Sequence, residues 1–134
     1  MTFPHAWRYR DYVITTFNQD MPFNDFVQQQ IAGDLLPAET HQDRHRNLVA
    51  TGFLAMGNNN LEDQDKGKLR MDVVDEQLEI ISRGFLAQTV GCARCHDHKF
   101  DPIPTRDYYA LAGILRNTKT LNDANVSKWI ELPL

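Results

Sequence analysis

The chain has 134 residues, a formal net charge of −4, and 42% hydrophobic residues. This length and hydrophobic content predict a single domain over residues 1–134 with an apolar core. An acidic chain without a basic stripe is a poor partner for nucleic acid, and its apolar runs are too short to span a membrane. Composition therefore excludes nucleic-acid binding and a transmembrane span.

Apolar side chains recur at helical spacing along most of the chain, which predicts about five helices. In chain order, these helices are expected at residues 6–18, 23–33, 40–56, 69–88 and 105–116. The fourth is the longest and is expected to run directly into the segment that begins at residue 92. No strand alternation of useful length is present, so the predicted class is all-α in one compact domain.

Capping and breaking residues support these boundaries. Thr40 and Thr105 are the expected N-caps of the third and fifth helices, because their hydroxyls accept from backbone N–H groups. Gly33 is the expected C-cap of the second helix. Residues 118–134 show no clear period and predict an irregular tail or linker, in which Trp129 and Ile130 form an apolar anchor.

Both cysteines of the chain lie three residues apart, as Cys92 and Cys95, and His96 follows directly. Thiols at positions i and i+3 of a helical turn project on the same side, so each can add to one vinyl group of a porphyrin. The imidazole of His96 then binds the iron as proximal ligand. The motif predicts covalent haem c, with Ala93 and Arg94 as unconstrained spacers.

Two other chemistries stay open on this spacing. Cys92 and Cys95 could form a disulfide or act as a thiol pair, or they could belong to a zinc site completed by His96, His98 or carboxylates. The alternative function is then a non-haem helical accessory module, held by a disulfide or a bound metal, that supports a neighbouring catalytic domain. Serine nucleophile, phosphate-loop and His-Glu-x-x-His patterns are lacking, so no catalytic residue is predicted for this chain alone.

The haem pocket and the second axial ligand require residues outside the motif. Pocket residues are expected to be aromatic or cationic, and the candidates are Phe53, Phe85, Phe100 and Lys99. The candidates for the distal ligand are Met56, Met71, His41 and His45, and the alternatives are an open face on the iron or a ligand from outside this chain. His98 emerges on the same side as His96, so it is a candidate to support that ligand. Arginine partners for the propionates are Arg70, Arg83, Arg94 and Arg106.

Four sequence blocks together resemble a known family. They are residues 9–13 (YRDYV), 30–36 (QIAGDLL), 50–54 (ATGFL) and 91–102 (GCARCHDHKFDP). They are similar to the planctomycete-type cytochrome-like domain, a domain of unknown function found in large multidomain secreted proteins. The resemblance covers about residues 7–117.

This resemblance implies an exported haem-binding module whose reaction is not established. With haem attached in the periplasm, the expected partner is a redox partner or a neighbouring domain of the same larger protein. Family members usually begin further upstream and carry a signal peptide. The first residues of this chain show no secretory signal, so we expect an N-terminally truncated form. The leading prediction is an electron-transfer module of a larger exported protein.

Overall fold

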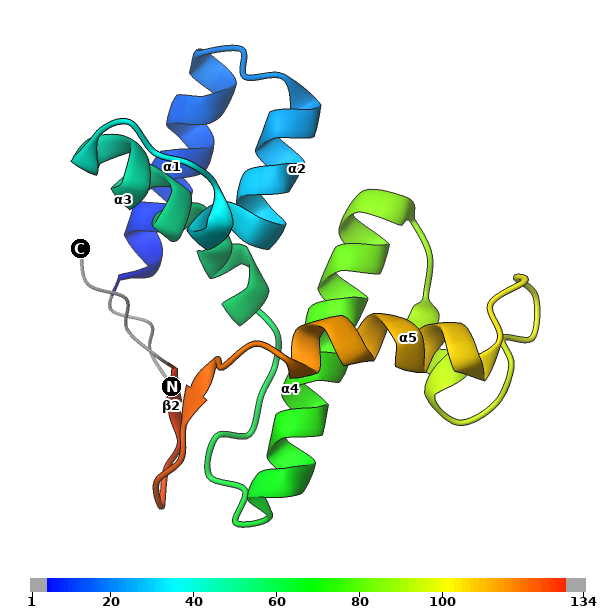
Figure 1. The fold of residues 1–134 in the computed structure, drawn as a ribbon. Helices are drawn as coiled ribbons and strands as arrows, with labels where there is room; N and C mark the ends of the chain where they lie inside the picture. The colour runs from blue at the N-terminus through cyan, green and yellow to red at the C-terminus, as the bar shows by residue number, and fades with distance from the viewer. Residues whose placement is uncertain (1–4, 130–134) are drawn as a thin grey trace. The chain divides into compact units, whose positions relative to one another are not determined.

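A computed structural model of the chain describes residues 5–129 (Figure 1). These residues form five α-helices, several short 3-10 and π turns, and one hairpin of two very short strands. The predicted all-α class is confirmed. Within residues 5–129, no helix combines the length and apolarity needed to cross a membrane. The chain divides into two compact units, which meet in sequence between Met56 and Gly57.

Unit 1 covers residues 5–56 of the described chain. Its elements are α1 (Ala6–Asn18), α2 (Phe23–Ala32), the 3-10 turn η1 (Gly33–Leu35), α3 (His41–Ala50) and the 3-10 turn η2 (Thr51–Ala55). The Thr40 cap is confirmed, because its hydroxyl accepts from the Asp43 N–H at 3.0 Å. The third helix keeps its α form only to Ala50 and then tightens into η2.

Polar side chains form much of the interior of unit 1. Gln30 is fully buried, accepts from the Tyr9 hydroxyl, and donates through Nε2 to the Tyr12 hydroxyl at 3.1 Å. The Tyr12 hydroxyl in turn donates to Oε1 of Gln29 at 2.9 Å. These hydrogen bonds join α1 to α2.

Gly33 lies at the C-cap of α2, as predicted. Its φ of −58° is helical, so the position does not need the left-handed freedom of glycine. A Cβ there would lie 2.2 Å from the carbonyl oxygen of Asn47 on α3. Glycine is required because the backbone of α3 approaches this closely.

Unit 2 covers residues 57–129 of the described chain. Its elements are α4 (Lys66–Ile81), the π turn η3 (Ser82–Leu86), the 3-10 turn η4 (Val90–Arg94), α5 (Thr105–Arg116), β1 (Leu121–Asn122) and β2 (Lys128–Trp129). The helix predicted at 69–88 begins earlier, because the Asp65 carboxylate accepts from the Lys68 N–H at 2.9 Å.

The prediction that this helix runs directly into the cysteine motif is wrong. It widens into the π turn η3, and Ala87 then adopts a left-handed conformation with φ of 53°. The Gln88 N–H closes the turn by donating to the Ser82 carbonyl at 3.1 Å. Alanine favours helix, so the sequence carried no signal for this break.

Two apolar clusters hold unit 2 together. One joins α4, η4 and α5, and its buried members are Val74, Leu78, Val90, Ala93, Tyr108, Ala112 and Leu115. The other consists of Leu61, Leu69, Val73 and Leu121, with Trp129 packed against it. The motif-bearing turn η4 is therefore part of an apolar core.

Residues 121–129 form a hairpin where an irregular tail was predicted. Leu121 pairs with Trp129 and Asn122 with Lys128 in antiparallel register, and the Ser127 N–H donates to the Leu61 carbonyl at 2.8 Å. Strands of two residues are too short to produce a visible alternation, which explains the error. Trp129 packs as the predicted anchor, whereas Ile130 lies outside the described residues.

Candidate functional site

The 3-10 turn η4 presents the three residues of the predicted haem site. Cys92 lies within η4, Cys95 is its C-cap, and His96 follows. Both thiols are free and exposed, and His96 is also exposed. A 3-10 helix has three residues per turn, so side chains at i and i+3 lie directly above one another. The structure thus places both cysteines on one side of a short turn.

The residues between and before the cysteines anchor this turn. Val90 is 3% exposed and Ala93 is fully buried among the side chains of α4 and α5. The Gly91 N–H donates to the Glu79 carboxylate, and a Cβ on Gly91 would lie 2.3 Å from the oxygen that accepts it. The prediction that Ala93 is an unconstrained spacer is wrong, because its side chain fills a closed position in the core.

Arg94, predicted to be the second unconstrained spacer, also faces inward. Its guanidinium pairs with Oδ1 of Asp72 at 3.2 Å and with Oδ2 of Asp75 at 3.1 Å, both on α4. The Tyr108 hydroxyl of α5 donates to the other Asp75 oxygen at 2.6 Å. The guanidinium therefore links the turn to both helices, a role that linear spacing did not reveal.

This network shifts the pKa values of Tyr108, Asp72 and Arg94, and the first two define which forms of these groups interact. Burial raises the pKa of the Tyr108 hydroxyl, and the adjacent Asp75 carboxylate raises it further. Burial also acts to raise the pKa of Asp72, but hydrogen bonds from Lys68 and Arg94 outweigh this effect and lower it overall. At neutral pH, Tyr108 is therefore a neutral donor and Asp72 a carboxylate, which are the forms that the observed contacts require.

The His96 ring is oriented by the backbone that follows it. Its Nδ1 lies 2.8 Å from the carbonyl oxygen of Asp97. A carbonyl oxygen only accepts, so the ring proton of neutral His96 is on Nδ1. This tautomer leaves an unprotonated lone pair on Nε2. A carbonyl that accepts from one ring nitrogen is the usual support for a histidine whose other nitrogen binds a metal.

Side chains on both sides of the motif secure the loop after His96. Oδ1 of Asp97 accepts from the Thr105 N–H at 2.8 Å, at the start of α5. The N-cap position of α5 is Pro104, not Thr105 as predicted, and this remote carboxylate supplies the acceptor that the proline lacks. His98 contacts Thr89 through Nε2 at 3.3 Å and accepts from the Asp101 N–H at 2.9 Å.

The predicted pocket residues lie in different parts of the structure and differ in exposure. Phe100 is 83% exposed, and Nζ of Lys99 lies 5.1 Å from the centre of its ring. Phe85 is half-buried in η3, and Phe53 belongs to η2 of unit 1. Lys99 and Phe100 therefore lie on the loop that follows His96, whereas Phe53 is in the other unit.

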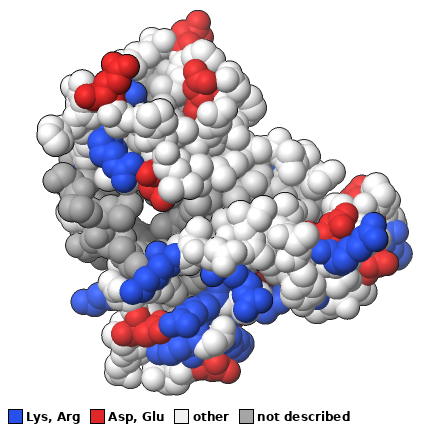
Figure 2. Space-filling model, viewed as in Figure 1, with Lys and Arg blue, Asp and Glu red and all other residues white. Residues whose placement is uncertain are grey.

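The four arginines considered as propionate partners all have carboxylate neighbours. Arg70 pairs with Asp123 and Arg83 with Glu79, Arg106 lies 3.5 Å from Asp107, and Arg94 is held as described above. In Figure 2, acidic side chains lie beside basic ones on the visible face of unit 2. Within residues 5–129, Lys99 forms no ion pair, so it is the cation near the motif that has free capacity for an anionic group.

The predicted distal ligands lie in both units. Met71 is on α4 of unit 2 and is half-buried, whereas His41, His45 and Met56 belong to unit 1. The identity of the distal ligand stays a prediction. Across residues 5–129, no group of three or more His, Cys, Asp or Glu side chains is arranged to hold a metal ion.

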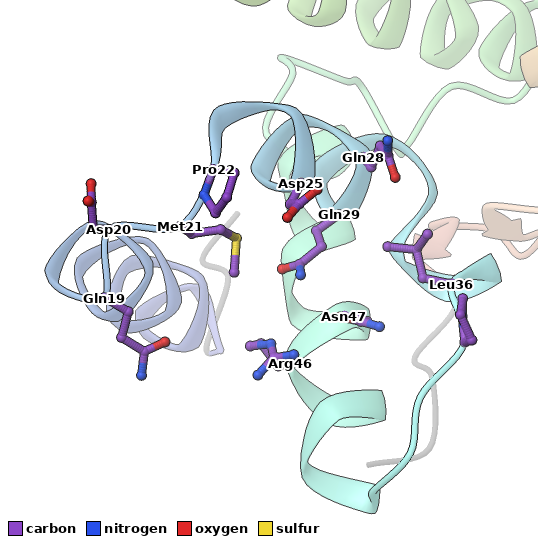
Figure 3. A pocket seen from close by; sticks show the side chains of 11 residues that line it. Gln19, Asp20, Met21, Pro22, Asp25, Gln28, Gln29, Leu36, Arg46 and Asn47 are labelled. Atoms are coloured by element: carbon purple, nitrogen blue, oxygen red, sulfur yellow. The ribbon is translucent and has the colours of Figure 1, made fainter.

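Unit 1 contains a separate open groove of about 460 Å³ (Figure 3). Gln29 of α2 and Arg46 of α3 extend into the same space, and Asp25 and Asn47 also line it. None of the predicted site residues lines this groove. The chemistry-bearing residues predicted from the sequence are therefore centred on η4 of unit 2.

Fold and site together define a mostly α-helical module that presents a Cys-x-x-Cys-His turn from a packed helical frame. The chain belongs to the family PSCyt2, described as protein of unknown function (DUF1549), whose model matches residues 1–120. The predicted membership of a family of unknown function is thus confirmed, and its description names no cofactor. No curated protein and no solved structure matches the chain.

Proposed function

We propose that unit 2 carries a covalently attached haem c and that the protein serves as an electron-transfer module of a larger exported protein. The observation that carries the proposal is the His96 ring, which donates from Nδ1 to the Asp97 carbonyl beside two free, exposed thiols. This arrangement leaves an unprotonated Nε2 directed away from its backbone partner. Such a nitrogen is the one that a proximal haem ligand requires.

The residues present fit the cofactor. Each thiol would add across one vinyl group: the sulfur of Cys92 or Cys95 forms a bond to one vinyl carbon, and the hydrogen goes to the other. His96 would supply the axial nitrogen through Nε2. Lys99 is the cation available for a propionate, and the exposed ring of Phe100 offers apolar surface near it. Bound haem supplies the iron that changes oxidation state.

The frame beneath η4 supports this function by limiting movement of the ligands. Ala93 is locked in the apolar cluster, and Arg94 is held by carboxylates of α4. Sites built on packed elements keep their geometry more closely than sites on unsupported loops. A proximal ligand and two attachment points held in this way change little in position when the iron is oxidised or reduced.

Thioether attachment of haem takes place outside the cytoplasm, so the proposal includes export of the full-length protein to the periplasm. The redox partner is then another domain of the same protein or a separate exported protein. Met71 is the candidate for the second axial position that lies in unit 2, and without it that position would be open to a small ligand.

The proposal is tested by producing the 134-residue chain behind a periplasmic signal in a host that matures c-type cytochromes. We expect the denatured protein to retain the mass of one haem, and the reduced protein to show a sharp α-band. Cys92→Ala with Cys95→Ala removes both attachment points, and the mass increment should vanish. His5→Ala is the matched control for a histidine outside the motif, because His5 is exposed and has no predicted role, and it should retain the haem.

A wild-type chain that emerges from this host without covalent haem would overturn the proposal. A Cys92–Cys95 disulfide or stoichiometric zinc in that sample would identify the accessory module as the correct alternative. Intact mass, thiol titration and metal analysis on one preparation therefore separate the three chemistries.

A further inference from the structure

One buried side chain, His98, ties together the segments on either side of the motif. Its side chain is 7% exposed, although its neighbours Asp97 and Lys99 are exposed. Nδ1 accepts from the N–H groups of Asp101 at 2.9 Å and Phe100 at 3.3 Å. Nε2 contacts the hydroxyl of Thr89 at 3.3 Å, three residues before Cys92. Both ring nitrogens are thus occupied within the protein.

These contacts define the state of the His98 ring. Nδ1 accepts from backbone donors, so it carries no proton, and the proton of the neutral ring is on Nε2, directed at Thr89. Oδ2 of Asp101 also lies 3.2 Å from Nδ1. The two backbone donors nevertheless place Nδ1 in the role of an acceptor. With both nitrogens engaged, His98 is not a free metal ligand.

The peptide bond that joins Asp97 to His98 connects this ring to His96. Its carbonyl oxygen accepts from Nδ1 of His96, and its N–H donates to the carbonyl of Ile103 at 2.9 Å. A peptide unit is planar, so its C=O and N–H rotate together. A rotation that moves the Asp97 carbonyl away from His96 also breaks the bond to Ile103. His98 holds the loop between these two points, through residues 100 and 101.

We propose that His98 is the positioning residue of the motif: it fixes the 97–98 peptide so that His96 keeps its proton on Nδ1 and its lone pair on Nε2. The role of that lone pair as an iron ligand rests on the proposed function. The tautomer itself does not, because it is a property of the protein without haem. His98 acts through His96 and does not touch the cofactor.

The test measures the tautomer of His96 in the complete 134-residue chain, produced in the cytoplasm without haem. Two-bond proton–nitrogen NMR spectra at about pH 8, above the ordinary histidine pKa, identify which ring nitrogen carries the proton. We expect wild-type His96 to be the Nδ1–H form. His98→Ala should shift the Nε2 signal of His96 toward the protonated range, because free imidazole side chains favour the Nε2–H form.

Two further variants distinguish positioning from general stability. In His98→Asn, the amide Oδ1 takes the place of Nδ1 as acceptor for residues 100 and 101, so it should restore the wild-type tautomer. Thr89→Val removes only the Nε2 partner and should produce a smaller shift than His98→Ala. His5→Ala, in unit 1, should leave the His96 signals unchanged. If His98→Ala does not fold, as judged by circular dichroism, the Asn and Val variants decide the question.

An Nε2–H tautomer of His96 in the wild type would overturn the proposal, as would an unchanged His96 signal in folded His98→Ala. If that variant does not fold, an unchanged signal in folded Thr89→Val or loss of the Nδ1–H form in folded His98→Asn would overturn it as well. Failure of the haem proposal looks different: the wild type then lacks covalent haem after periplasmic maturation, while the tautomer result stands.

Discussion

The two units differ in the balance between polar and apolar side chains in their interiors. In unit 1, a chain of hydrogen bonds runs through the buried side chains of Tyr12, Gln29 and Gln30, while Phe17 and Phe23 remain about 70% exposed. In unit 2, two clusters of aliphatic and aromatic side chains form the interior. An apolar core loses stability when its volume changes, whereas a polar network does so when a donor or acceptor is removed.

This difference bears on which unit can hold a cofactor site. A close-packed apolar interior fixes the residues set into it, and Val90 and Ala93 of η4 are set into one. The outward residues of the same turn, Cys92, Cys95 and His96, are thereby held at the surface. Unit 2 therefore presents the motif from a packed apolar frame.

The largest expected effect tests the apolar interior of unit 2. Leu69 is 2% exposed within the second cluster, so Leu69→Ala should lower the free energy of unfolding by about 3 kcal/mol. Urea denaturation followed by tryptophan fluorescence measures this change. The chain has two tryptophans, Trp7 in unit 1 and Trp129 in unit 2, so single-tryptophan variants report each unit separately.

In the protein that keeps only Trp129, Leu69→Ala should lower the free energy of unfolding by this full amount. Ile114→Ala is the matched control, because Ile114 is 66% exposed on α5, and its effect should stay within about 0.5 kcal/mol. If Leu69→Ala and Ile114→Ala lowered the free energy of unfolding equally, burial of Leu69 would not be what stabilises this cluster. A Trp7 transition that moves as far as the Trp129 transition would show that the two units unfold as one.

The helices themselves were predictable because their signals are local. The 6–18 span and the Thr40 cap follow from periodicity and from one hydroxyl. The break at Ala87 was not predictable, since alanine favours helix and the backbone bond between Ser82 and Gln88 that closes the turn leaves no pattern in the sequence. Two-residue strands likewise leave no periodic trace.

For the candidate site, the sequence identified the residues that project outward from η4, but it did not identify the residues that hold η4 against the helices. Cys92, Cys95 and His96 form a pattern in adjacent positions. The roles of Ala93 and Arg94 depend on helices some 20 residues earlier, since Arg94 pairs with Asp72 and Asp75. A short side chain and an arginine between two cysteines have no local signature, so these contacts needed the fold.

The second-largest expected change in the free energy of unfolding tests the polar interior of unit 1. Gln30→Leu keeps the approximate volume and removes both amide partners of the tyrosines, so we expect a loss of about 2 kcal/mol. Burial raises the pKa of Tyr9 to about 12, with a smaller contribution from Tyr12. The Tyr9 hydroxyl is therefore neutral at neutral pH and needs an acceptor. The variant that keeps only Trp7 reports this change in urea.

A double-mutant cycle with Tyr9→Phe separates the Tyr9–Gln30 bond from the rest of the network. The two changes together should cost less than the sum of the single changes, because they remove the same hydrogen bond. If Gln30→Leu leaves the free energy of unfolding unchanged or raises it, apolar packing rather than the polar network stabilises unit 1. The interiors of the two units would then not differ in the way described.

The smallest effect compares two glycines inside unit 2. A Cβ on Gly91 would lie 2.3 Å from the Glu79 oxygen that accepts its N–H, whereas a Cβ on Gly113 of α5 would meet no atom within 4 Å. Gly91→Ala must displace the Glu79 carboxylate and should cost about 1 kcal/mol. Gly113→Ala should instead stabilise the protein by about 0.5 kcal/mol, because alanine favours the interior of a helix.

The opposite signs make this pair a direct test of the anchoring of η4. Both changes add one methyl group to unit 2, but only the one at Gly91 disturbs the contact between η4 and α4. Urea denaturation of the Trp129-only protein measures both. If Gly91→Ala lowers the free energy of unfolding, the contact between η4 and α4 is strained by the added methyl group. The reactivity of the exposed Cys92 thiol should then also change. If both glycines tolerate alanine equally, the Glu79 carboxylate moves aside easily, and Val90, Ala93 and Arg94 fix the turn without it.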